Sequence, residues 1–121
     1  MTMNHIHLGT TNLERSIHFY ESFFGFKKKF DHGDGVFLED AQGFLLALDP
    51  VEKAPEFPSW FHLGFCLDSK EKVKAIYDKM EESGVNFIRP FKIYGDGAAA
   101  FLVSDPDGYQ IEVSWHQDEE S

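Results

Sequence analysis

The stretches His5-Ile-His-Leu-Gly-Thr-Thr11 and His62-Leu-Gly-Phe-Cys-Leu-Asp68 decide the fold, because the second repeats the pattern of the first 57 residues later. Each begins with a histidine, continues as a short strand and reaches a turn after six steps. A repeat of this length indicates two copies of one supersecondary unit. We therefore compare the two halves of the chain position by position.

An amphipathic helix is predicted after each of these strands. Thr11 and Asp68 are the predicted N-caps, because each is followed three positions later by a glutamate, which is the capping-box pattern. Gly25 and Gly84 stand where a left-handed C-cap residue would end each helix. The predicted core-facing residues are Leu13, Ile17, Tyr20 and Phe24 in the first helix and Val73, Ile76, Tyr77 and Met80 in the second.

Three short strands are predicted after each of these glycines. The last strand of each half follows a predicted turn, Asp40-Ala-Gln-Gly43 in one half and Asp105-Pro-Asp-Gly108 in the other. Each half is thus β-α-β-β-β, and the fold class is α+β. Because one helix covers only one face of a four-stranded sheet, a half must pair with another half. The predicted strands are 26–31, 35–39 and 44–49, then 85–92, 98–104 and 109–115.

The 121 residues are predicted to form a single domain of two modules. Three prolines between residues 50 and 59 exclude a helix or a central strand there, so this segment is the predicted linker. The predicted boundaries are 1–52 for the first module, 50–59 for the linker, 60–116 for the second module and 117–121 for an acidic tail.

The composition narrows the classes of partner. A net charge of −10 argues against nucleic acid and against anionic membrane surfaces, since an acidic surface repels phosphates. No apolar run approaches the ~20 residues that span a membrane, and a cytoplasmic protein is predicted. Cys66 is the only cysteine and lies in an apolar run, where a buried, inert thiol is expected.

Three polar residues interrupt the apolar pattern of the strands. The repeat places His5 on His62, so the two equivalent first strands each offer an imidazole to the same side of their sheets. It places Glu112, in the last strand, on Ala47 of the first half. If the halves pair face to face, two imidazoles and one carboxylate converge, which is a donor set for a divalent metal such as Mn, Fe, Ni or Zn. The predicted metal ligands are therefore His5, His62 and Glu112.

Further polar residues are predicted to line the same cavity. His7 shares a face with His5. It is the first candidate for a general base, because histidine is the side chain that ordinarily changes charge near neutral pH. A purely structural role for His7 is equally compatible with the sequence. The loop Tyr94-Gly-Asp-Gly97 could move over a ligand, although a simple tight turn explains it as well. The candidate catalytic residues are His7 and Tyr94. The candidate cavity residues are His7, Ala47, Arg89, Tyr94, Gln110 and Ser114, whereas His18, His32 and His116 are predicted surface residues.

The chain resembles the vicinal oxygen chelate superfamily, which includes glyoxalase I, fosfomycin-resistance thiol transferases, extradiol dioxygenases and bleomycin-resistance proteins. The residues that carry the resemblance are Leu13-Glu-Arg-Ser-Ile-His-Phe-Tyr20, Phe24-Gly25-Phe26, His62 and Asp105-Pro-Asp-Gly-Tyr-Gln-Ile-Glu112. The resemblance implies βαβββ modules that pair into a curved, barrel-like mixed sheet with a central cavity. It also implies a homodimer and metal ligands at His5, His62 and Glu112.

The resemblance implies a metal-dependent lyase, thiol transferase or dioxygenase acting on a small oxygen-bearing substrate. Ala47 departs from glyoxalase I, which has a metal-binding glutamate at that position, and therefore speaks against that activity. Arg89 and Lys92 are the only nearby candidates for holding a phosphonate in the manner of the fosfomycin transferases. The alternative is a binding protein similar to the bleomycin-resistance proteins, which sequesters a small, cationic ligand without catalysis.

Overall fold

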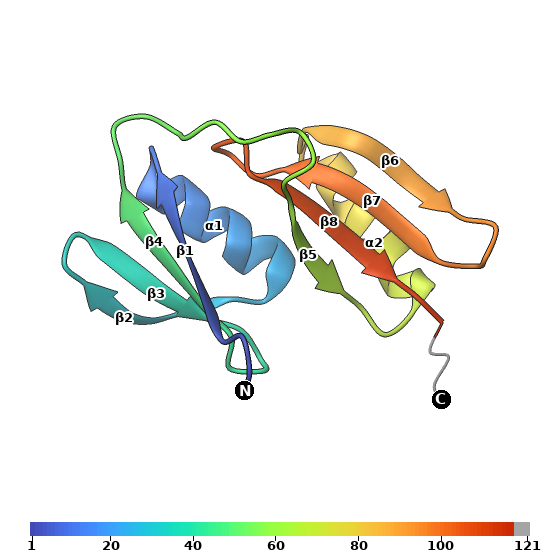
Figure 1. The fold of residues 1–121 in the computed structure, drawn as a ribbon, viewed down its shortest axis with the longest axis horizontal. Helices are drawn as coiled ribbons and strands as arrows, with labels where there is room; N and C mark the ends of the chain where they lie inside the picture. Colours follow the sequence, from blue (N-terminus) through green and yellow to red (C-terminus); the bar gives the residue numbers. More distant parts are fainter. Residues whose placement is uncertain (118–121) are drawn as a thin grey trace. The chain divides into compact units, whose positions relative to one another are not determined.

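The computed structural model describes residues 1–117, which form two units with the same order of elements (Figure 1). The first unit, Met1–Glu56, contains β1 (His5–Thr10), α1 (Leu13–Phe24), β2 (Lys27–His32), β3 (Gly35–Glu39) and β4 (Leu45–Pro50). The second unit begins at Phe57 and contains β5 (Leu63–Cys66), α2 (Lys70–Glu82), β6 (Phe87–Ile93), β7 (Ala99–Ser104) and β8 (Gln110–Trp115). The predicted α+β class with two tandem βαβββ modules is confirmed.

Each unit has one mixed, four-stranded sheet. The strand orders are β1-β4-β3-β2 and β5-β8-β7-β6, so the last strand of each unit lies between its first and third strands. The first and last strands pair in parallel, and the other neighbours pair antiparallel. One helix lies against one face of each sheet, and the side chains that alternate toward it form the core of that unit (Figure 1). Leu8, Leu38, Leu46 and Leu48 are buried in the first unit, and Phe101, Val103, Ile111 and Val113 in the second.

The strand register shows which residues of the two units are equivalent. His7 pairs with Ala47 in the first unit, and Gly64 pairs with Glu112 in the second. These pairs differ by 57 residues in the first strand and by 65 in the last, which are the offsets of the sequence repeat. The equivalence of Ala47 and Glu112, predicted from the repeat, is therefore confirmed by backbone pairing.

Both helices begin one residue later than the capping pattern predicts. Asn12 and Ser69 are the N-caps, with extended backbone conformations and side-chain oxygens that accept hydrogen bonds from the N–H groups of Arg15 and Lys72 at 3.1 Å. The prediction of Thr11 and Asp68 as caps was wrong. Each is followed directly by a second residue that can cap a helix, Asn12 or Ser69, and the sequence pattern did not distinguish the two positions. The C-cap of α1 is Gly25, with a φ of 73°, as predicted.

The buried face of α1 differs from the predicted stripe. Ser16, Phe19 and Tyr20 are its buried residues, whereas the other predicted residues of the stripe are half-buried. Ser16 is tolerated in this position because its hydroxyl is hydrogen-bonded to that of Thr10 at 2.6 Å. In α2 the predicted stripe is confirmed at Val73 and Met80, which are fully buried.

The turn before the last strand is built in the same way in both units. The Asp40 carboxylate accepts hydrogen bonds from the N–H groups two and four residues later, both at 2.9 Å. The Asp105 carboxylate does the same at 2.9 and 3.0 Å. In both turns the N–H of the glycine in the fourth position donates to the carbonyl of the aspartate at 3.1 Å. This shared turn sets the register at which β4 and β8 enter their sheets.

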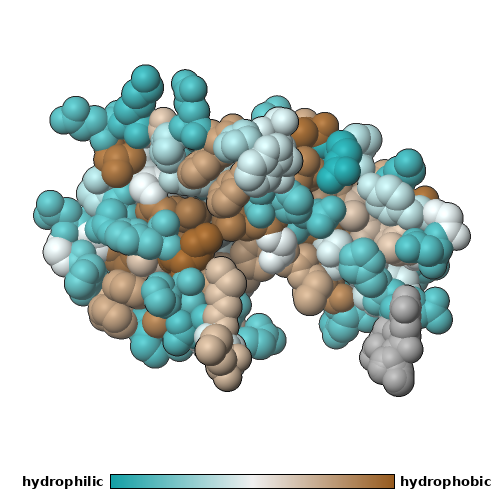
Figure 2. All heavy atoms as spheres, viewed as in Figure 1, coloured by the Kyte–Doolittle hydropathy of each residue, from teal (hydrophilic) through white to brown (hydrophobic). Residues whose placement is uncertain are grey.

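The surface seen in one view is mostly hydrophilic (Figure 2). Hydrophilic residues cover most of the face seen in Figure 2, with hydrophobic residues gathered around the middle of the first unit. None of the helices in residues 1–117 is long and apolar enough to span a membrane. Of the predicted acidic tail, residues 118–121 lie outside the described part of the chain.

Candidate functional site

An imidazole and a carboxylate face each other on the sheet of the second unit. His62 lies directly before β5, and Glu112 lies in β8, the strand that pairs with β5. The Nε2 atom of His62 is 3.9 Å from Oε1 of Glu112, and both side chains are partly exposed. Two of the three predicted metal ligands are therefore neighbours within one unit.

A hydrogen bond to the backbone determines which ring nitrogen of His62 carries the proton. The Nδ1 atom of His62 lies 3.2 Å from the carbonyl oxygen of Trp60, and because a carbonyl can only accept, Nδ1 carries the proton. In the neutral ring Nε2 then has a lone pair, and it is directed at a carboxylate oxygen that also has lone pairs. Such an arrangement suits a cation between the two atoms, and metal-bound histidines commonly have their other nitrogen bonded in this way.

Arg89 approaches the other oxygen of the same carboxylate. Its Nη2 atom lies 3.6 Å from Oε2 of Glu112. Backbone pairing places Arg89 opposite Leu102, and Leu102 opposite Glu112, so the three side chains share one face of the sheet. The Glu112 carboxylate therefore has one oxygen toward His62 and the other toward the Arg89 guanidinium.

His5, the third predicted ligand, belongs to the first unit and resembles His62 in its hydrogen bonding. Its Nδ1 atom lies 2.8 Å from the side-chain oxygen of Asn4. Because that oxygen is an acceptor, Nδ1 of His5 carries the proton, and its Nε2 atom has the lone pair. The two histidines that the repeat makes equivalent therefore have the same tautomer.

His7 has a partner that sequence reasoning did not identify. Its Nε2 atom forms a very short contact with Oδ2 of Asp49 in β4. Strand alternation was the available signal, since Asp49 lies two residues after Ala47, the residue opposite His7, and so shares its face. The contact leaves Nδ1 as the ring atom of His7 that can exchange a proton with a ligand.

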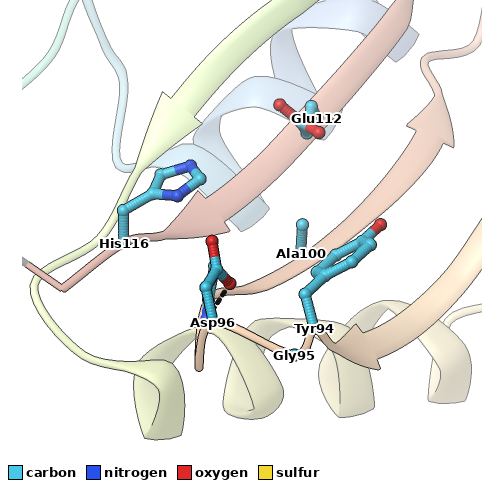
Figure 3. A pocket seen from close by; sticks show the side chains of 7 residues that line it. Tyr94, Gly95, Asp96, Ala100, Glu112 and His116 are labelled. Carbon is cyan, nitrogen blue, oxygen red and sulfur yellow. Dashed lines mark hydrogen bonds between the residues drawn. The ribbon is translucent and has the colours of Figure 1, made fainter.

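The second unit also has a pocket of about 520 Å³ beside Glu112. This volume lies within the usual range of small-molecule sites, roughly 300–1,000 Å³. Figure 3 shows the Asp96 carboxylate between the rings of His116 and Tyr94, with Glu112 farther along β8. The lining residues are Tyr94, Gly95, Asp96, Ala98, Ala100, Glu112 and His116.

The Tyr94–Gly97 segment is a hydrogen-bonded turn. The N–H of Tyr94 donates to the carbonyl of Ala98 at 2.8 Å, and the N–H of Gly97 donates to the carbonyl of Tyr94 at 2.9 Å. The Asp96 carboxylate accepts from the N–H of Ala98 at 3.0 Å. Of the two explanations that the sequence left open, the tight turn accounts for these contacts.

The remaining predicted residues have varied environments. Tyr94 and Glu112 line the pocket, whereas Arg89, Gln110 and Ser114 are not among its lining residues in residues 1–117. Ser114 is buried. His116, predicted to be a surface residue, is exposed and also lines the pocket.

The expectation of a buried Cys66 was wrong, and its thiol is exposed. The strand β5 lies at the edge of its sheet, and its residues alternate between half-buried and exposed. Cys66 is on the exposed side of this alternation, as is Gly64. The apolar residues next to Cys66 in the sequence therefore point to the opposite face of the strand and do not indicate that Cys66 is buried.

Residues 1–117 contain no group of three or more His, Cys, Asp or Glu side chains close enough to hold a metal. The second unit contains a pair of such side chains, His62 and Glu112, and the first unit contains another, His7 and Asp49. His62 and Glu112 are predicted ligands that need a third donor from elsewhere.

Known proteins match most of the chain. Residues 2–113 match the family model described as the Glyoxalase/Bleomycin resistance protein/Dioxygenase superfamily. The metallothiol transferase FosB of Lysinibacillus sphaericus (strain C3-41) is 28% identical over 114 residues, which cover 92% of this chain and 79% of that protein.

Two solved structures have a fold similar to that of this chain. The structure of a possible glyoxalase from Bacillus cereus has a TM-score of 0.78 and 29% identity, and the match covers 93% of this chain and 97% of that one. The fosfomycin resistance protein FosX from Listeria monocytogenes has a TM-score of 0.85 at 19% identity, covering 98% and 96% of the two chains. At 19% identity the likeness concerns the fold alone.

Proposed function

Because the chain belongs to the Glyoxalase/Bleomycin resistance protein/Dioxygenase superfamily, we propose that it is a divalent-metal-dependent enzyme acting on a small oxygen-bearing substrate. The proposed metal ligands are His5, His62 and Glu112. The observation that carries the proposal is the pair formed by His62 and Glu112, in which the unprotonated ring nitrogen faces a carboxylate oxygen.

The spacing of this pair suits a shared metal ion. Two ligand atoms bound to one tetrahedral ion lie about 3.4 Å apart, since each bond is about 2.1 Å long. The observed 3.9 Å between Nε2 and Oε1 is wider by roughly half an ångström, which a small side-chain rotation closes. Imidazole and carboxylate suit Mn, Fe, Ni and Zn, and we leave the identity of the metal open among these.

The third ligand in the proposal is His5, which the other unit supplies. Its Nδ1 atom donates to Asn4, so its Nε2 atom is free to bind a metal. The other unit can be that of the same chain or that of a second copy. We propose a homodimer, because each four-stranded sheet has one face that its own helix leaves uncovered.

Each residue of the proposed site has a defined task. When bound, the metal would supply Lewis-acid stabilisation of negative charge on a substrate oxygen. Arg89 holds one oxygen of Glu112 and leaves the other for the metal. His7, whose Nε2 atom is held by Asp49, can accept a substrate proton at Nδ1. Tyr94 lines the pocket and can donate a hydrogen bond from its hydroxyl to the substrate.

The proposed reaction is that of a thiol transferase, a lyase or a dioxygenase. The likeness to a metallothiol transferase supports a transferase. Ala47 speaks against a reaction that needs a carboxylate in the first unit, because the register makes it the equivalent of Glu112. A cytoplasmic location remains a prediction from the sequence.

The second candidate is a protein that binds a small cationic ligand without catalysis. The observation that favours it is the carboxylate of Asp96 in a pocket lined partly by the Tyr94 ring. This candidate needs no metal, so metal binding separates it from the enzyme.

The deciding experiment is a calorimetric titration of metal-free protein with Zn²⁺, with Mn²⁺, with Ni²⁺ and, without oxygen, with Fe²⁺. We expect one site, and we expect His62→Ala and Glu112→Gln to weaken binding by more than about 100-fold, because loss of a ligand costs more than loss of a residue that orients one. His18→Ala is the matched control, since it removes an exposed imidazole from α1. A wild-type protein that binds none of the four metals would contradict the proposal and favour the binding protein.

A further inference from the structure

The pocket beside Glu112 follows β8 toward its end. Glu112 and His116 both line it, and the four residue steps between them span about 13 Å when the chain is extended. Ala98 and Ala100 also line it, and because both side chains are small, they leave room above the sheet. The pocket is therefore long enough for a small molecule that reaches Glu112 at one end and the Tyr94–Gly97 turn at the other.

The charges differ between the two ends of the pocket. At one end the Arg89 guanidinium lies 3.6 Å from the Glu112 carboxylate. At the other end is Asp96, with which no Lys, Arg or His of residues 1–117 forms an ion pair. The carboxylate of Asp96 is thus the pocket's uncompensated negative charge.

The Asp96 carboxylate is also held in position. Its Oδ1 atom accepts a hydrogen bond from the N–H of Ala98 at 3.0 Å, which ties it to the turn. Figure 3 shows the carboxylate on the pocket side of that turn, beside the His116 ring. A carboxylate fixed in this way costs little side-chain entropy when it binds a ligand, so it favours a ligand group of opposite charge.

We propose that the substrate carries a cationic nitrogen, which Asp96 binds while the substrate's metal-binding oxygens lie at the Glu112 end. This proposal rests on the proposed function, because the metal site accounts for the oxygen end of the substrate. Tyr94 lines the same pocket, so an ammonium group at Asp96 would also lie near an aromatic ring. A substrate with a carboxylate at that end would be repelled.

Two catechols of matched shape test the proposal. Dopamine and 3,4-dihydroxyphenylacetate share two vicinal oxygens that chelate a metal, and they differ in the charge of the side chain. We would measure their binding to the zinc-loaded protein by calorimetry without oxygen. We expect dopamine to bind about tenfold more tightly or better, because attraction of the amine and repulsion of the acid add.

Asp96→Asn shows whether the preference comes from this residue. Asparagine keeps the oxygen that accepts from Ala98 and removes the charge, so the turn is retained. We expect the preference for dopamine to fall to about threefold or less, with unchanged zinc affinity. Asp78→Asn is the matched control, because Asp78 lies on α2 in an ion pair with Lys74, and it should keep the preference. Ala100→Leu should weaken both catechols by filling the pocket.

The outcomes separate this proposal from the metal site. Equal binding of the two catechols, no binding of either to zinc-loaded protein, or a preference that survives in Asp96→Asn would overturn the proposal while the metal site stands. If wild-type protein binds no zinc or other metal, the proposed function fails. The two compounds are then compared on metal-free protein, where equal or absent binding overturns the cation site as well.

Discussion

The two units have the same elements but different polar residues at equivalent positions. Where the first unit has His7 opposite Ala47, the second has Gly64 opposite Glu112. The first unit thus has an imidazole paired with Asp49, and the second has a carboxylate facing His62. The buried residues preserve the duplication, while the exposed face of each sheet has changed. The same fold therefore accommodates different polar residues at equivalent strand positions.

The largest expected effect concerns the buried positions that the units share. Leu46 and Ile111 are equivalent by register and almost fully buried. We expect Leu46→Ala and Ile111→Ala each to lower the free energy of unfolding by about 2–5 kcal/mol, because each leaves a cavity beside a helix. Urea denaturation followed by circular dichroism measures this. A loss below about 1 kcal/mol in one unit would break the equivalence of the two cores.

The two turn aspartates should have the next largest effect. Asp105 is buried and Asp40 is half-buried, although their carboxylates accept equivalent hydrogen bonds. We expect Asp105→Ala to cost about 1–3 kcal/mol, since it leaves the buried N–H group of Tyr109 without this partner. Asp40→Ala should cost less because water reaches its turn. Thermal melts of the two variants compare them directly. A greater loss for Asp40→Ala would contradict the role assigned to burial.

Arg89 tests the orientation of the carboxylate that distinguishes the second unit. We expect Arg89→Gln to weaken metal binding by about tenfold, because residues that orient a ligand typically contribute 10–100-fold. Lys92→Gln is the matched control, since Lys92 contacts the Tyr94 ring and forms no ion pair with Glu112. Metal titration by calorimetry is the measurement. Tighter binding by Arg89→Gln would show that Arg89 competes with the metal instead of orienting its ligand.

The smallest expected effect concerns the helix caps. Asn12 and Ser69 occupy equivalent positions, and each accepts one backbone hydrogen bond at 3.1 Å. We expect Asn12→Ala and Ser69→Ala each to reduce stability by about 1 kcal/mol, and Thr11→Ala to reduce it by less. Thermal denaturation distinguishes these positions. If Thr11→Ala were the more damaging substitution in α1, the capping assignment would be wrong.

Much of the fold could be predicted because it depends on short-range patterns. Strand alternation, capping residues and turn residues identified every helix and strand, with boundaries within a few residues. The repeat also predicted that Ala47 is equivalent to Glu112, which the register confirms. The predicted face of α1 failed at Ser16, because the buried hydroxyl is satisfied by Thr10 of β1 and helical spacing does not report such a contact.

Less of the site could be predicted, since its contacts join residues far apart in the chain. The sequence indicated His62 and Glu112 as ligands, but not that Arg89 orients the carboxylate. It suggested His7 as a base, but it did not indicate the contact between His7 in β1 and Asp49 in the neighbouring strand β4. His116 is exposed as predicted, but the sequence did not indicate that it lines the same pocket as the Tyr94–Gly97 turn.

The sequence by itself determined the duplicated βαβββ order and the candidate ligands, because periodicity, caps and turns act over a few residues. The tertiary structure decided which nitrogen of His62 faces Glu112, which cation approaches that carboxylate and which residues line the pocket beside it. These features depend on the register of neighbouring strands and on hydrogen bonds between distant residues. The residue pattern within one segment of the chain does not indicate such contacts.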